Sequence, residues 1–164
     1  MLPRLLLLLC LLFLSQTPLA QQPAMAKQND VPESCPVTKF SDHPFVPPYP
    51  YRAKPQMGSS YFGSDGLWIV PPGNGEMLGL RHKMSWWRQG YDWRTEPTPK
   101  LRVTGRRLDA QAPPLEVDGP NAVGVKGPPQ NYMMIGVTFP TPGCWEITGR
   151  DENDELTFVV WVTR

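Results

Sequence analysis

The C-terminal residues 140–164 show the alternation of apolar and polar positions that is typical of a β-hairpin. Residues 145–147 alternate an aromatic, an acidic and an aliphatic side chain, and residues 149–155 form a polar run rich in Asp, Glu and Asn. Residues 156–162 are β-branched or aromatic at most positions. We therefore expect two antiparallel strands joined by a polar turn.

The same alternation predicts which side chains of the hairpin face the core. Residues that share one face, and are expected to pack inward, are Trp145, Ile147, Leu156, Phe158, Val160 and Val162. Cys144 then points outward, together with Val159 and Trp161 on the partner strand. An outer face with these side chains is too apolar to be fully solvated, so another segment is expected to cover it.

Upstream of the hairpin, short β-like runs alternate with Gly, Pro and Asn. Strands are predicted near residues 61–62, 67–70, 78–81, 84–88, 101–108, 115–117, 122–125 and 132–139, and turns at 64–66, 71–75, 118–120 and 126–129. No run of ten or more residues has helical periodicity without a Pro or Gly. The pattern predicts an all-β, immunoglobulin-like β-sandwich over residues 56–164.

The N-terminal segment has the pattern of an export signal. Arg4 precedes ten mostly leucine positions at 5–14, and residues 15–20 are polar and end in a small residue. The apolar run is too short for a comfortable membrane span, so we expect a signal peptide at residues 1–20 with cleavage after Ala20, although residues 24–26 offer a second site. No membrane span remains after cleavage. The mature chain is then secreted or periplasmic, in the bacterial cell envelope.

Residues 21–55 are first polar and then rich in proline, which excludes a helix or a central strand. The aromatic side chains between the prolines favour an arm laid along the domain over a free linker. In an oxidising compartment Cys35 and Cys144 can form a disulfide that would tether this arm to the hairpin, although two free buried thiols remain an alternative. Lipid modification of Cys10 is a further alternative, but this residue lies inside the apolar run.

Charge excludes two classes of partner. The chain has 16 basic and 15 acidic residues, and removal of Arg4 with the signal balances them. A balanced chain has no field that attracts nucleic acid or an anionic membrane. The expected partner is therefore an extracytoplasmic protein or a glycan.

One cluster has the composition of a binding surface. Its members are Trp86, Trp87, Arg88, Tyr91, Trp93 and Arg94. Aromatic faces beside guanidinium donors can stack sugar rings or extended ligands and satisfy their hydroxyl groups. The alternative is structural, with one tryptophan of the 86–87 pair in the core and the other beneath a loop.

No catalytic motif is present, and no catalytic residue, cofactor or metal ion is expected. Carboxylates at 65, 92, 109 and 116 could still meet in space, which keeps a carbohydrate-active or other cell-envelope hydrolase open as an alternative. His82 and Met84, with Met77 and the methionines at 133–134, could bind copper in a third interpretation. The acidic run 151–155 lacks the spacing of a calcium loop, so a solvated hairpin tip is expected there.

Several segments together resemble a group of uncharacterised secreted bacterial proteins. They are 35–38 (CPVT), 45–48 (FVPP), 61–68 (YFGSDGLW), 86–88 (WWR), 101–110 (LRVTGRRLDA) and 139–149 (FPTPGCWEITG). More loosely, the 142–147 segment and the strand that follows are similar to the last hairpin of bacterial immunoglobulin-like domains. The resemblance implies export and a β-sandwich, and it supplies no catalytic residue. The sequence thus predicts an exported, non-catalytic binding or structural module.

Overall fold

The computed structural model describes residues 31–51, 60–124, 126 and 131–164. The predicted signal peptide, Cys10 and arm residues 21–30 and 52–55 lie outside these ranges, as does most of the predicted turn at 126–129. No helix within the described ranges has the length and hydropathy needed to cross a bilayer.

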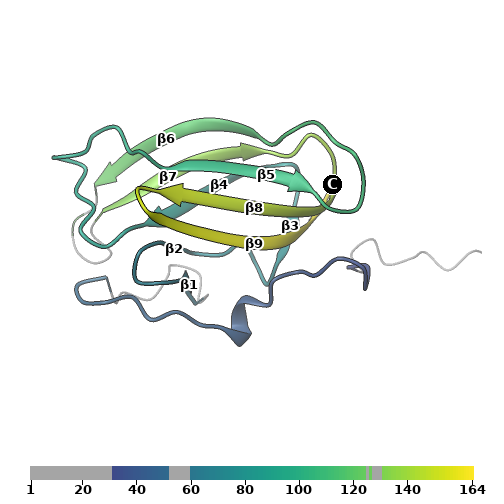
Figure 1. Cartoon of the computed structure of the whole chain (residues 1–164), viewed down its shortest axis with the longest axis horizontal. Helices are drawn as coiled ribbons and strands as arrows, with labels where there is room; N and C mark the ends of the chain where they lie inside the picture. The colour runs from purple at the N-terminus through teal and green to yellow at the C-terminus, as the bar shows by residue number, and fades with distance from the viewer. Residues whose placement is uncertain (1–30, 52–59, 125, 127–130) are drawn as a thin grey trace, which may run out of the picture.

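The strands form two packed sheets, which confirms the predicted all-β sandwich (Figure 1). One sheet has the order β1-β2-β4-β7-β6 and the other has the order β3-β9-β8-β5. All strand pairs are antiparallel except β3 with β9. The strand bounds are β1 Phe62–Gly63, β2 Trp68–Ile69, β3 Glu76–Leu78, β4 Arg81–Trp87, β5 Arg102–Arg107, β6 Glu116–Gly124, β7 Asn131–Thr138, β8 Gly143–Asp151 and β9 Asp154–Thr163.

The core lies between the two sheets and includes the inward face of the terminal hairpin, as the alternation predicts. Trp145, Ile147, Val160 and Val162 have no exposed surface, and Phe158 is 1% exposed. Leu156 is partly buried against this core. The alternation of apolar and polar residues along β8 and β9 therefore predicts correctly which face of the hairpin packs into the core.

The hairpin turn is much shorter than the polar run that predicts it. The strands pair as far as Asp151 opposite Asp154, so only Glu152 and Asn153 remain in the turn. Glu152 has a φ of 52°, the left-handed conformation that tight hairpin turns require. The ladder continues through the polar run, where Arg150 pairs with Glu155 and Asp151 is buried.

Two other predicted boundaries are wrong. The predicted strand at 78–81 spans the end of β3, the two-residue connection at 79–80 and the start of β4, and Gly79 in the connection has a φ of 87°. The predicted turn at 118–120 lies inside β6, which continues past it with a register shift between Asp118 and Asn121. Pro120 is tolerated there because β6 is an edge strand and needs no N–H on its open side.

The proline-rich arm is part of the domain. Cys35 and Cys144 form the predicted disulfide, with Cα atoms 5.7 Å apart. Thr38 then donates its N–H to the carbonyl of Val159 at 2.9 Å and accepts the N–H of Val159 on Oγ1 at 2.8 Å. Phe40 enters the core beside Phe158, their ring centroids 5.7 Å apart. The arm thus runs along β9, and it leaves Val159 half-buried on the outer face.

Candidate functional site

The two tryptophans at the end of β4 face opposite sides of the five-stranded sheet. Trp86 has no exposed surface and belongs to the core between the sheets. Trp87 is 5% exposed and belongs to a second cluster on the outer face. Its ring centroid lies 5.4 Å from those of Tyr61 and Tyr132. Both indoles therefore have structural contacts within the domain.

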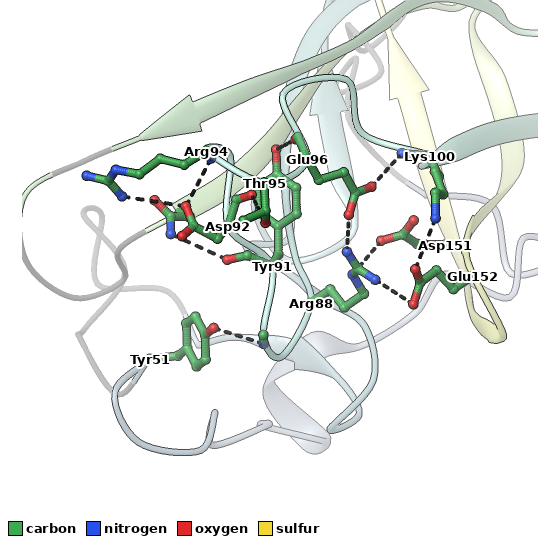
Figure 2. A network of polar contacts seen from close by, with 12 residues as sticks. Tyr51, Arg88, Tyr91, Asp92, Arg94, Thr95, Glu96, Lys100, Asp151 and Glu152 are labelled. Carbon is green, nitrogen blue, oxygen red and sulfur yellow. Dashed lines mark hydrogen bonds and ion pairs between the residues drawn. The ribbon is translucent and has the colours of Figure 1, made fainter.

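Arg88 follows β4 directly and is the centre of a polar cluster (Figure 2). Its side chain is 13% exposed and forms ion pairs with Glu96, with Asp151 at 3.0 Å and with Glu152 at 2.6 Å. Lys100 approaches Glu152 to within 3.4 Å through its Nζ and donates its backbone N–H to Glu96 at 3.1 Å. The cluster ties the loop between β4 and β5 to the turn between β8 and β9.

Asp151 is the unusual member of this cluster. Its side chain has no exposed surface, and neither carboxylate oxygen has a hydrogen-bond partner among the described residues. Arg88 Nε lies close to Oδ2, but outside hydrogen-bond geometry. Burial raises the pKa of Asp151 above the ordinary aspartate value, and the charge of Arg88 only partly offsets this.

Tyr91 closes the end of the sandwich at the start of the same loop. It is 1% exposed, donates its hydroxyl to the carbonyl of Glu96 at 3.2 Å, and accepts the side-chain N–H of Asn131 on its own carbonyl. Burial, and then the charge of Glu96, raise the pKa of Tyr91 to about 12. The phenol is therefore neutral at physiological pH, and its contacts are those of a packing residue.

Trp93 and Arg94 are the two members of the sequence cluster that reach the surface. Trp93 is 38% exposed, and the Arg94 guanidinium lies 4.9 Å from its ring centroid. The indole also lies against Gly124, where an added Cβ would fall 2.2 Å from Nε1. Asp92 accepts the backbone N–H of Arg94 at 3.0 Å. Trp93 therefore packs against Gly124 and carries the Arg94 guanidinium over its ring.

The arm presents two more exposed apolar side chains. Val46 is 69% exposed and Tyr49 is 84% exposed. The segment is fixed because Tyr51, which is buried, accepts the backbone N–H of Gly90 on its hydroxyl at 3.0 Å (Figure 2). We call the exposed residues of these two segments the loop surface: Val46, Tyr49, Trp93 and Arg94.

Sequence reasoning missed Val46 and Tyr49 as surface residues. It assigned the aromatic residues of the arm to packing, which holds for Phe45 and Tyr51 but not for Tyr49. A signal was present, since Tyr49 stands between two prolines, where a side chain has few neighbours to pack against. The remaining large hydrophobic side chain exposed in the described part of the chain is Val117, in β6.

The copper and hydrolase interpretations involve residues that have other contacts. His82 Nε2 lies 2.8 Å from the carbonyl oxygen of Gly79, while the methionines at 77, 84 and 133 are buried in the core. Within the described ranges, no three His, Cys, Asp or Glu side chains are arranged to hold a metal ion. Of the four carboxylates considered, Asp92 caps its own loop and Asp109 binds Arg107.

Asp109 anchors the disulfide region. It accepts hydrogen bonds from Arg107 Nε at 2.7 Å and from the backbone N–H of Cys144 at 3.2 Å. The hydrogen bond from Arg107 holds the pKa of Asp109 below its ordinary value. Because the folded pKa is lowered, the stabilisation exists above the unfolded pKa of about 3.9 and is lost as the pH falls through the folded pKa.

We expect Asp109→Asn to lower the free energy of unfolding at pH 7 by about 1 to 2 kcal/mol, because a charged hydrogen bond is weakened. The deficit should shrink below about pH 4, where the wild-type carboxyl also becomes neutral. Urea denaturation across this pH range measures both effects, and Asp65→Asn, at an exposed position, is the control. A deficit that does not change with pH would contradict the role of the charge.

Comparison with known proteins adds little to this picture. No protein-family model matches the chain, and no curated protein matches it. A solved structure described as a "Putative Lipoprotein from Bacillus anthracis" is similar over 84% of this chain and 99% of that chain, with 11% sequence identity and a TM-score of 0.38. At that TM-score, no feature of the site can be transferred from one protein to the other.

Proposed function

We propose that this protein is an exported, non-catalytic β-sandwich that binds an extracytoplasmic protein or glycan of the cell envelope through the loop surface. One observation carries the proposal. Among the described residues, three of the four exposed large hydrophobic side chains lie on two segments joined by the Tyr51–Gly90 hydrogen bond. The disulfide supports an oxidising location, since such bonds persist mainly outside the cytoplasm.

The residue types and their support are suited to binding. Tyr, Trp and Arg dominate the energetics of protein interfaces because they bury large areas and retain a polar group. Trp93 already packs against Gly124 and Arg94, so it would lose little side-chain entropy when a ligand docks. Loops fixed on a rigid β-sandwich are also a common position for recognition residues.

We expect Tyr49→Ala and Trp93→Ala each to weaken binding by about tenfold, the effect of losing one interface hot spot. Val117→Ala is the matched control, because it removes an exposed hydrophobic side chain from β6. The binding probes are an array of peptidoglycan fragments and other envelope glycans, and site-specific photo-crosslinking from position 49 in intact cells.

The two variants and the control separate the outcomes. Weaker binding in both loop-surface variants, with binding unchanged in Val117→Ala, would support the proposal. Equal binding in all four proteins would place the contact surface elsewhere and refute it. Binding is measured well below the unfolding temperature of each variant, so that any loss is not caused by unfolding.

A further inference from the structure

The polar cluster around Arg88 holds more negative than positive charge. Two cations, Arg88 and Lys100, contact the carboxylates of Glu96 and Glu152, and these four side chains balance. Asp151 adds a third carboxylate, and it is the most deeply buried. The cluster is therefore neutral when Asp151 is protonated and carries one uncompensated negative charge when it is ionised.

An ionised Asp151 has poor compensation within the cluster. The Arg88 guanidinium already binds Glu96 through one terminal nitrogen and Glu152 through the other. Only its Nε faces Asp151, and that contact lacks hydrogen-bond geometry. A buried carboxylate without hydrogen bonds is costly in its charged form and much less so when it is neutral.

The position of the cluster gives this charge a mechanical consequence. Glu96 and Lys100 belong to the β4–β5 loop, which also carries Trp93 and Arg94, while Asp151 and Glu152 belong to the β8–β9 hairpin (Figure 2). Arg88 joins the two segments by ion pairs to both. Repulsion between the carboxylates of the cluster therefore weakens the attachment of the loop to the hairpin.

We infer that Asp151 is a proton-dependent switch, in which its protonated carboxyl allows the β4–β5 loop to dock on the hairpin and its ionisation loosens that loop. The switch would leave the loop surface better ordered at low pH than at high pH, and only this consequence for binding rests on the proposed function. The switch itself follows from burial, charge and connectivity.

Among the described residues, the charged and titratable groups around Asp151 belong to four segments. Arg88 comes from the end of β4, Glu96, Lys100 and Tyr91 come from the loop, Glu152 comes from the hairpin turn, and Asp154, opposite Asp151 in the ladder, comes from β9. The carboxylates of Glu96 and Glu152 add to the rise in the pKa of Asp151, and Lys100 opposes it. Tyr91 stays neutral throughout the relevant range, so it does not compete for the proton.

The direction of the effect follows from linkage. Since the docked state binds the proton of Asp151 more tightly than an opened state does, the extra stabilisation of docking is fully present below the ordinary aspartate pKa and is lost as the pH rises through the folded pKa. Between the ordinary aspartate pKa and the folded value, each pH unit changes the equilibrium for loop opening by up to about tenfold. The loop should therefore open more often as the solution becomes less acidic.

Two NMR measurements on the full domain test the switch. A ¹³C titration reports the ionisation of Asp151 directly, and hydrogen exchange of the Tyr91 and Thr95 amides reports loop opening, because both donate within the loop. The observed exchange rate of each amide is divided by its intrinsic rate at that pH, and the ratio is compared with that of the Ile135 amide in β7.

We expect this ratio for the loop amides to rise with pH in the wild-type protein. It should stay constant in Asp151→Asn, whose side chain imitates the neutral carboxyl. Glu155→Gln, at an exposed carboxylate that pairs with Arg150 outside the cluster, should keep the rise.

The outcomes for the switch and for the proposed function are distinct. An equal pH response in Asp151→Asn, or an Asp151 that titrates at or below the ordinary aspartate value in the wild-type protein, overturns the switch. The second result needs no variant, so it holds even where Asp151→Asn does not fold. Unchanged binding in Trp93→Ala refutes the loop surface and leaves the switch intact.

Discussion

Loss of the Cys35–Cys144 disulfide is expected to lower the free energy of unfolding by roughly 3 to 5 kcal/mol. The two cysteines are 109 positions apart, so the bond restricts nearly the whole domain in the unfolded state. The bond also anchors the arm close to Thr38, whose hydrogen bonds to β9 would otherwise have no covalent tether nearby.

Urea denaturation of the double variant Cys35→Ser, Cys144→Ser measures this effect. Thr38→Val is the control, since it removes the hydrogen bond to the N–H of Val159 and keeps the disulfide. We expect a loss of about 1 kcal/mol in the control. A double variant as stable as the control would mean that the arm is held by its other contacts, chiefly those of Phe40 in the core.

Trp86→Ala should also cost roughly 3 to 5 kcal/mol, the range for a large aromatic side chain deleted from a packed core. Its indole lies against Gly149 so closely that an added Cβ there would fall 2.3 Å from the ring, and its centroid lies 6.1 Å from that of Phe158. The surrounding backbone belongs to paired strands and cannot move in to fill the space.

The matched variant for this prediction is Trp93→Ala, which removes an identical side chain from the loop surface. Because Trp93 is 38% exposed, its deletion should lower the unfolding free energy by only about 1 kcal/mol. Thermal and urea unfolding of both variants measure the contrast. Equal losses would show that Trp93 stabilises the fold as much as the core tryptophan does, and would weaken its assignment to binding.

The contrast between these two tryptophans shows what sequence reasoning could and could not reach. The period of two predicts the core face of β8 and β9 correctly, because each strand is long and one of its faces is buried. It places Trp86 and Trp87 on opposite faces of a strand, but it does not show which of them lies in the core, which lies under the arm, or that Trp93 reaches the surface. Their environments depend on segments distant in sequence.

The same limit applies to the polar cluster. Arg88 follows a strand and Asp151 ends another, and neither position carries a local signal that the two side chains meet. The acidic run at 151–155 was expected to be a solvated hairpin tip, which fits Glu152 and Glu155 but not the fully buried Asp151. Because burial of that carboxylate is a tertiary property, it could be found only from the folded structure.

The irregular edge strand β6 bears on how the protein behaves at high concentration. An exposed strand with a regular backbone is a template for a strand of a second molecule, and such pairing leads to aggregation. In β6 the register shift between Asp118 and Asn121 breaks the ladder, and Pro120 has no N–H to donate. An approaching strand could pair with only a few residues on either side, so this border of the sandwich resists fibrillar assembly.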